Sequence, residues 1–296
     1  MMSLEAMGVP EYSSKKSKKT YSDHAKIALL VLRQYLDRSY ERFSKDLGSM
    51  GGVMKEAAID RVPDPSTLSK FSMRTDAEMI KRIIENTAKL VCIPGIIAAI
   101  DSTGFSCSNA SRHYVKRLKE MSGKQGMEYS LVNVKGYSKT SISVDTSSLV
   151  ILSVDVCPSN MADVTRLPYL IDDMRDAGYG VRYVVADKGY DSENVHRYIR
   201  ENLKCETMIP VRRKSEPAKT NSSRTRTSGF YRVLKNFNFN ADIYRKRSLV
   251  ETVNSMIKRN MSDTVYGHSD QTRCVEIVCR CVAHNIMRIM DLNVEV

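Results

Sequence analysis

The stretch GIIAAID, residues 95–101, is a continuous apolar run that ends in a carboxylate. Directly after the helix breaker Pro94-Gly95, such a run predicts a strand buried inside a sheet, with Asp101 delivered to the sheet edge. The stretch VRYVVAD, residues 181–187, repeats the pattern and ends at Asp187. Two buried strands that each end in an aspartate therefore predict an α/β core with both carboxylates at strand ends.

The segments around these strands predict a mixed sheet flanked by helices. SISVDTSSLVILSVDV, residues 141–156, alternates on both sides of a Thr-Ser-Ser turn, as in a β-hairpin. Residues 162–178 and 193–203 have helical patterns, and CETMIPV, residues 205–211, reads as a further strand. Asp191 or Ser192 can cap the helix that begins at residue 193, and we expect capping rather than catalysis from Asp191.

The front of the chain predicts a different kind of structure. Residues 1–20 are rich in Ser and Lys and are expected to form a disordered basic tail. Residues 21–92 hold several short helical patterns with proline-marked connections, which predicts a small all-helical domain preceding the catalytic domain of residues 93–296. The helical domain is either a helix-turn-helix-like DNA reader, which we expect, or a plain cap on the catalytic part. Residues 212–229, with six basic residues, are expected to be a loop.

The charge of the chain indicates a polyanionic partner. Its 296 residues include 46 Lys and Arg against 34 Asp and Glu, a net charge of +12. Nucleic acid is the favoured partner, with an anionic membrane surface as the alternative. No run of 18 apolar residues and no apolar leader segment occurs in the sequence, so we expect an intracellular protein that does not use a membrane.

Four of the potential metal ligands cluster near the C-terminus: Cys274, Cys279, Cys281 and His284. Thiolates and imidazole bind zinc, but the spacings are not those of paired short loops. The surrounding valines and isoleucines favour a buried helix in which cysteine is a small apolar residue.

The stretch YRKRSLVETVNSMIK, residues 244–258, predicts an amphipathic helix. At about 100° per residue, Arg247, Glu251 and Lys258 fall at roughly 300°, 340° and 320° from Tyr244, in one polar stripe opposite an apolar face. Taken alone, such a stripe is also what a solvated helix face looks like.

Three carboxylates thus stand out by position: Asp101, Asp187 and Glu251. Rigid strand ends and a packed helix can hold hard oxygen ligands around two Mg²⁺ ions, as two-metal phosphoryl transfer requires. Each aspartate alone is equally consistent with a turn-initiating residue.

These residues carry a resemblance to a known family. IIAAIDST, VVADKGYDS and the spacing of Tyr244, Arg247, Glu251 and Lys258 resemble the three acidic blocks of DDE-type insertion-sequence transposases, specifically the insertion-sequence 4 and 5 superfamily. The last block has the same spacing as that group's Tyr-Arg-Glu-Lys signature, and SNMADVTRL resembles the segment between the first two acids. The resemblance covers residues 96–258.

The resemblance implies an RNase H-like fold and a transposase that cuts phosphodiester bonds at transposon ends and joins the 3′ hydroxyl to target DNA. Asp101, Asp187 and Glu251 would bind two Mg²⁺ ions, for which Mn²⁺ can substitute, while Tyr244, Arg247 and Lys258 would hold double-stranded DNA. A homodimer at the paired terminal inverted repeats, in the cytoplasm with the nucleoid, is expected. Two alternatives remain: a transposase-derived DNA-binding protein that does not cut, and a stand-alone metal-dependent nuclease.

Overall fold

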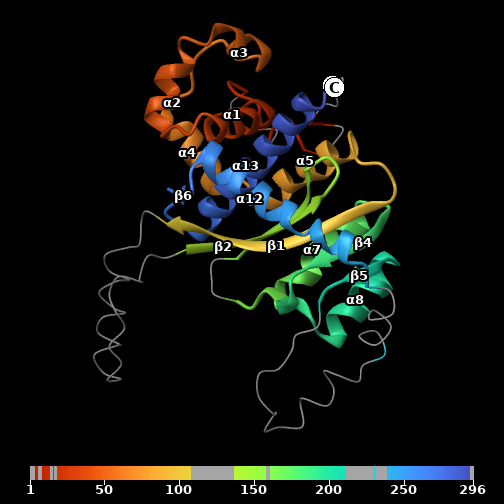
Figure 1. Cartoon of the computed structure of the whole chain (residues 1–296). Helices are drawn as coiled ribbons and strands as arrows, with labels where there is room; N and C mark the ends of the chain where they lie inside the picture. The colour runs from red at the N-terminus through yellow and green to blue at the C-terminus, as the bar shows by residue number, and fades with distance from the viewer. Residues whose placement is uncertain are drawn as a thin grey trace, which may run out of the picture.

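The computed structural model describes residues 4–5, 9–13, 16, 19–107, 137–157, 161–210, 230 and 239–293. One mixed sheet of six strands has the order β3-β2-β1-β4-β5, and β6 also pairs with β1 (Figure 1). The strands are β1 Ile96–Cys107, β2 Tyr137–Asp145, β3 Ile151–Cys157, β4 Val181–Ala186, β5 Glu206–Met208 and β6 Thr264–Val265. The β1–β2 and β2–β3 pairs are antiparallel, as the predicted hairpin requires, and the other pairs are parallel.

The first half of β1 is buried on both faces, which explains its continuous apolar sequence. Ala98 and Ile100 belong to the core on one face of the sheet, and Ala99 belongs to the core on the other. The sequence predicts that this strand stops at Asp101, and that prediction is wrong. The strand continues because Phe105 is buried again and pairs with β2, and the end of the strand also pairs with β6.

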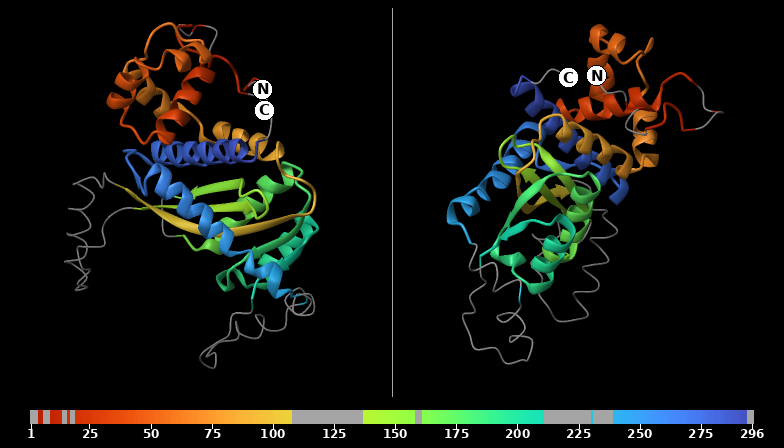
Figure 2. Two further views of the ribbon diagram at one scale, coloured as in Figure 1. Left: turned by 45° about the horizontal axis from the view of Figure 1, so that its top comes forward. Right: turned by 90° about the vertical axis from the view of Figure 1, so that its right-hand side faces the viewer.

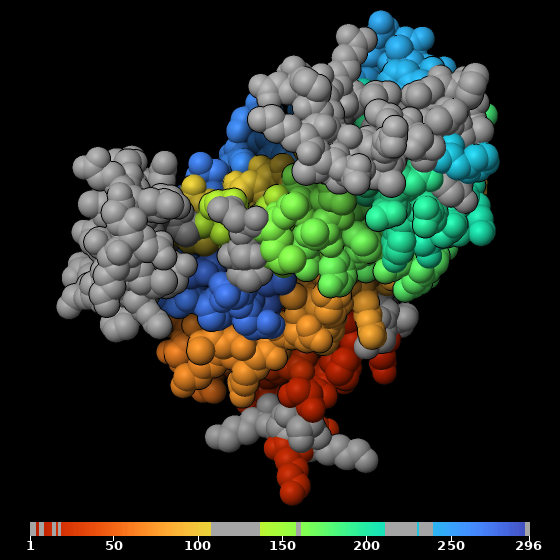
Figure 3. Space-filling view, turned by 90° about the horizontal axis from the view of Figure 1, so that it is seen from below, coloured from red at the N-terminus to blue at the C-terminus, as the bar shows by residue number. Residues whose placement is uncertain are grey.

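Helices α7, Asp163–Asp176, and α8, Glu193–Leu203, cover one face of the sheet. They pack side by side, and Figure 3 shows them as neighbours, light green and teal, on the surface seen from below. Ser192 caps α8 by accepting the N–H of Val195. Asp191 is not the cap, because its carboxylate is buried against the ring of His196, with Oδ1 3.2 Å from Nε2.

Helices α5, Ala77–Lys89, α12, Ser248–Met261, and α13, Asp270–Asp291, cover the opposite face. Figure 2 shows α13 between the sheet and the N-terminal helices. α5, which the sequence places in the helical domain, packs on α13 and on β3. Among the described residues, no helix is long and apolar enough to cross a bilayer.

The N-terminal region is helical, as predicted, with α1 Asp23–Tyr35, α2 Tyr40–Leu47, α3 Gly51–Glu56 and α4 Pro65–Arg74. Ser22, Ser39 and Asp64 cap α1, α2 and α4 through side-chain bonds to backbone N–H groups. α3 was not predicted, since its two glycines are poor helix formers. The stretch expected to be a disordered tail includes Val9, whose side chain is fully buried in the main core.

Candidate active site

Asp101 and Asp187 are neighbours across two parallel strands. The parallel pairing of β1 with β4 ends at Ile100 and Ala186, and each aspartate is the residue that follows. Adjacent strands are about 4.8 Å apart, so the two aspartates lie about one strand spacing from each other. Both are half-buried. The structure thus brings together the first two acids that the sequence predicts.

The turn that follows Asp187 holds its carboxylate. Oδ1 accepts a hydrogen bond from the backbone N–H of Gly189 at 2.7 Å, which makes Asp187 the N-cap of the 3-10 helix η2, Lys188–Tyr190. A Cβ on residue 189 would lie 2.8 Å from this oxygen, closer than unbonded atoms approach. Any larger residue at position 189 would therefore force the carboxylate or the turn to shift.

A chain of hydroxyl groups connects the two acidic segments, and sequence reasoning missed it. The hydroxyl of Tyr190 lies 3.3 Å from Oγ of Ser102, and that Oγ lies 2.7 Å from Oγ of Ser141 on β2. Ser102 follows Asp101, and Tyr190 closes the turn that begins at Asp187. Burial raises the pKa of Tyr190, so its hydroxyl stays protonated at neutral pH. Only the DKGY motif hinted at this role.

Glu251 reaches the site on α12, but not through the single helix that the sequence predicts for residues 244–258. A separate short helix, α11, Ala241–Arg245, is two residues away from the start of α12. At the junction the N–H of Arg247 bonds to the carbonyl of Tyr244, three residues back, at 2.9 Å. Such a 3-10 step turns by about 120° per residue rather than 100°. The prediction of one uninterrupted helix over residues 244–258 is therefore wrong, but residues three apart in a 3-10 step lie on the same side, so Tyr244 stays on the side of Arg247.

Arg247 and Glu251 do share one face, as predicted. Nη2 of Arg247 donates a hydrogen bond to Oε1 of Glu251, and the two groups form an ion pair one helical turn apart. The Glu251 side chain is 52 % exposed, and the Arg247 side chain is 23 % exposed. α12 packs against β1 and β2 through Val253 and Ile257, so the ion pair lies over the sheet beside Asp101.

The electrostatics of Asp101 show that these groups are close to one another. Burial raises the pKa of the Asp101 carboxyl, and the charges of Glu251 and Asp187 raise it further. The N–H of Ser102 and the guanidinium of Arg247 act in the opposite direction and lower it. Three carboxylates and one arginine therefore share one site, in which repulsion between the acids favours the binding of a cation.

The three carboxylates are suited to a hard divalent cation, because all their donor atoms are oxygens. Within the described ranges, however, no three His, Cys, Asp or Glu side chains are close enough to hold a metal ion. Glu251 is bound to Arg247 instead. A metal centre at Asp101, Asp187 and Glu251 would thus need Glu251 to leave its arginine partner.

The remaining two signature residues, Tyr244 and Lys258, each lie beside an aromatic ring. The ring of Tyr244 stacks beside Phe239, with centroids 5.6 Å apart. The ammonium of Lys258 lies 5.4 Å from the ring centroid of Phe105, near the far end of β1. Seven residues of helix separate Lys258 from Glu251, about 10 Å along the axis. Lys258 is therefore not in contact with the acids. The expected basic loop, residues 212–229, is outside the described residues.

The C-terminal cysteine cluster lies within α13 and is largely buried, as the predicted apolar helix requires. Burial raises the pKa of the Cys279 and Cys281 thiols to about 12, so both are protonated at neutral pH. Burial also lowers the pKa of His284 to about 4, and its Nε2 lies 2.9 Å from the carbonyl oxygen of Leu149. His284 thus attaches α13 to the turn of the β2–β3 hairpin.

Comparison with known families agrees with this geometry. The family model described as "Transposase DDE domain" matches residues 94–286, well over half of the chain. None of the curated proteins matches the sequence. The matched range holds all three carboxylates, the whole sheet, helices α7, α8, α11 and α12 and most of α13. The mixed sheet flanked by helices is consistent with the RNase H-like fold of such domains. The chain therefore belongs to the transposase DDE domain family.

Proposed function

We propose that this protein is a transposase that cuts phosphodiester bonds at transposon ends and joins the freed 3′ hydroxyl to target DNA. The observation that supports it best is the gathering of Asp101, Asp187 and Glu251 at one end of two parallel strands. The family match supports transposase function in general. The spacing of Tyr244, Arg247, Glu251 and Lys258 supports membership of the insertion-sequence 4 and 5 superfamily.

The proposed cofactor is Mg²⁺, with two ions held by Asp101, Asp187 and Glu251 and with Mn²⁺ as a substitute. When bound, the ions would supply Lewis-acid activation of the attacking oxygen and stabilisation of the leaving oxygen. The chain supplies rigidity, because Asp101 belongs to a buried strand and the Asp187 carboxylate accepts the backbone N–H of Gly189. Arg247 holds Glu251 in the resting state and can donate the same N–H groups to a DNA phosphate.

The proposed substrate is double-stranded DNA, both the terminal inverted repeats and the target. A net charge of +12 favours the binding of a polyanion. Arg247 at the start of α12 and Lys258 near its end place positive charges along the helix, and Lys258 lies beside β1. A homodimer would pair two ends, and we expect the protein to act in the cytoplasm in association with the nucleoid. The N-terminal helices are proposed to contribute to DNA binding.

The deciding experiment is cleavage of a duplex that contains the ends of the protein's own element. Wild type is compared with Asp187→Asn, Glu251→Gln and the control Asp176→Asn, which changes an exposed acid on α7. With Mg²⁺, wild type and the control should cut at the element boundary and join the ends to a target plasmid. The two site variants should bind the duplex without cutting it.

Other outcomes would favour the alternative functions. Binding without cleavage by wild type, in both Mg²⁺ and Mn²⁺, would replace the proposal with a DNA-binding protein derived from a transposase. Metal-dependent cleavage that never yields joined products would favour a stand-alone nuclease. Equal cleavage by wild type and by Asp187→Asn would show that the catalytic centre lies elsewhere.

A further inference from the structure

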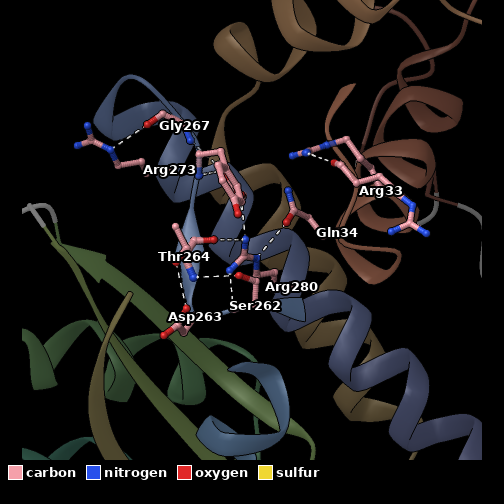
Figure 4. A network of polar contacts seen from close by, with 11 residues as sticks. Arg33, Gln34, Ser262, Asp263, Thr264, Gly267, Arg273 and Arg280 are labelled. Carbon is pink, nitrogen blue, oxygen red and sulfur yellow. Dashed lines mark hydrogen bonds and ion pairs between the residues drawn. The ribbon is translucent and has the colours of Figure 1, made fainter. Parts of the chain in front are cut away.

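A cavity of about 590 Å³ lies where the N-terminal helices meet the start of α13. Its wall from the helical region includes Arg33, Tyr40 and Ser69, and its wall from the catalytic part includes Tyr266, His268 and Ser269. This cavity is separate from the acidic site, and no role has been assigned to it so far. Figure 4 shows the adjoining contacts, in which Gln34 of α1 meets Arg280 of α13.

Arg33 is the unusual residue of this cavity. It is only 6 % exposed, its Nη1 donates to the carbonyl of Arg38 at 2.7 Å, and its guanidinium lies 4.1 Å from the ring centroid of Tyr40. Within the described part of the chain, its Nε has no hydrogen-bond partner and its guanidinium forms no ion pair. Buried charges in proteins are normally paired, because an isolated one is costly to desolvate. Among the described residues, Arg33 therefore has no paired counter-charge.

The acids of the cavity wall do not supply this counter-charge. Oε1 of Glu276 pairs with Arg280 at 2.9 Å, and its Oε2 accepts the N–H groups of Tyr266 and Gly267. Glu276 is thus neutralised by its own partners. Asp37 also lines the cavity, but it is exposed and its charge is screened by water. The site consequently keeps a positive charge that an anion could use.

Two helix N-termini add to the positive potential of the cavity. Ser39 caps α2 and Ser269 caps α13, and both caps are part of the wall. The first turn of a helix carries a partial positive charge and favours anions. With Arg33 these termini surround the cavity from both the helical region and the catalytic part.

We propose that this cavity binds a backbone phosphate of duplex DNA, with Arg33 as its charged donor. The inference rests on the proposed function, because it takes DNA as the ligand. The cavity walls come from two parts of the chain, so one bound phosphate bridges the N-terminal helices and the start of α13. DNA binding at this point fixes the orientation of the helical region relative to the acidic site.

The test is the affinity of the full-length protein for a fluorescent duplex, measured by anisotropy at several salt concentrations. Arg33→Gln removes the charge, and Arg175→Gln is the control, since Arg175 lies exposed on α7 over the opposite face of the sheet. For Arg33→Gln we expect a Kd raised roughly tenfold, because a charge-assisted hydrogen bond is lost. The slope of log Kd against log salt should fall by about one, as for one lost phosphate contact. Arg175→Gln should leave both quantities unchanged.

A second pair of variants keeps the test valid if Arg33→Gln does not fold, which thermal melting followed by circular dichroism would reveal. Ser69→Glu places a negative charge in the wall and should weaken DNA binding at least as much, whereas Ser69→Ala should not. Unchanged affinity and salt slope in both Arg33→Gln and Ser69→Glu would overturn the proposal.

Inorganic phosphate separates the two sources of the anion. Stabilisation of wild type by millimolar phosphate, lost in Arg33→Gln while DNA affinity is kept, would mean that the cavity takes free phosphate and would also overturn the proposal. Failure of the proposed function is distinguishable from either result. It would appear as absence of Asp187-dependent cleavage, whereas Arg33→Gln should still cut when the duplex is saturating.

Discussion

At the scale of single residues, the acidic site depends on small groups that hold the carboxylates. Gly189 bonds to Asp187 through its backbone, and Tyr190 reaches the strand of Asp101 through the hydroxyl of Ser102. Neither residue is a ligand or a charge. Their contribution is to limit the conformations of the two aspartates, and preorganised groups of this kind lower the cost of reaching a reactive geometry.

Gly189→Ala should therefore damage the site without unfolding the protein. The new methyl group would meet Oδ1 of Asp187 at 2.8 Å, so the carboxylate or the turn must move. We expect Mn²⁺ affinity, measured by electron paramagnetic resonance, to fall about tenfold, as for the loss of groups that orient a ligand. Gly52→Ala is a matched control, because a Cβ there meets no atom within 4 Å. Equal Mn²⁺ affinity in both variants would contradict the role given to Gly189.

Tyr190→Phe should test the hydroxyl chain in the same way. It removes one hydroxyl from a buried ring, and a reduction of several-fold in Mn²⁺ affinity is expected, because the link from η2 to Ser102 is lost. The matched control is Tyr179→Phe, whose hydroxyl donates to the carbonyl of Glu85 at 3.1 Å on the outer side of the sheet. If both variants lower the melting temperature alike and neither changes Mn²⁺ affinity, the hydroxyl of Tyr190 has only a structural role.

At the scale of secondary structure, α12 is the element that places the third acid. Its buried face packs on β1 and β2, while Glu251 and Arg247 remain on the accessible face. The short 3-10 step before α12 separates it from α11, and the ring of Tyr244 packs beside Phe239. The position of Glu251 thus follows from the packing of one helix face.

Ile257→Ala should lower both stability and cleavage. Ile257 is 1 % exposed in the main core, and its truncation should cost about 2–5 kcal/mol of unfolding free energy because a cavity remains. Urea denaturation measures this loss, and the cleavage assay at low temperature shows whether Glu251 has lost its position. Ser255→Ala, on the exposed face of the same helix, should change stability by less than about 0.5 kcal/mol. A comparable effect of both variants would argue against this packing of α12.

At the scale of the whole molecule, α13 connects the helical region with the sheet. Arg280 donates to the carbonyls of Ser262 and Thr264 and to Gln34, which connects the end of α12, the strand β6 and helix α1 (Figure 4). Further along, His284 lies against the β2–β3 hairpin. The stability of the fold therefore depends on polar groups buried along one helix.

The contribution of His284 to stability should consequently be lost in mild acid, whereas Asp173, whose pKa burial raises to about 6, acts in the opposite direction. Burial lowers the pKa of His284 from about 6.5 to about 4, so the unfolded chain takes up a proton between these values and the folded protein does not. As pH falls from 6.5 to 4, this difference should remove on the order of 3 kcal/mol of unfolding free energy. Urea denaturation across that range is the measurement.

The control for the acid effect is an exposed histidine. His284→Gln should be less stable at pH 7 but should show a flatter dependence on pH, because the titrating group is gone. His268→Gln, on the surface, should keep the wild-type pH dependence. The same pH dependence for wild type and for His284→Gln between pH 6.5 and 4 would show that His284 is protonated in the folded protein as easily as in the unfolded chain.

The amino-acid pattern alone was sufficient for the parts of the molecule that depend on local periodicity. Continuous apolar runs identify β1 and β4, and the alternation around Thr146 identifies the β2–β3 hairpin. Placing Asp101 and Asp187 after those runs was enough to nominate them as a pair, because parallel strands bring their carboxyl ends to one edge. The family match agrees with the transposase resemblance of the same stretches, although it does not separate the insertion-sequence 4 and 5 group from other members.

Tertiary structure decided what depends on contacts between distant residues. β1 continues past Asp101 because β2 and β6 pair with it. The Asp191 carboxylate contacts the ring of His196 instead of capping a helix. The Ser102–Tyr190 contact spans 88 residues, and the Gln34–Arg280 contact spans 246. Local patterns report which face of an element is apolar. They do not report which polar group on another element will meet it, since that choice is made when the elements pack.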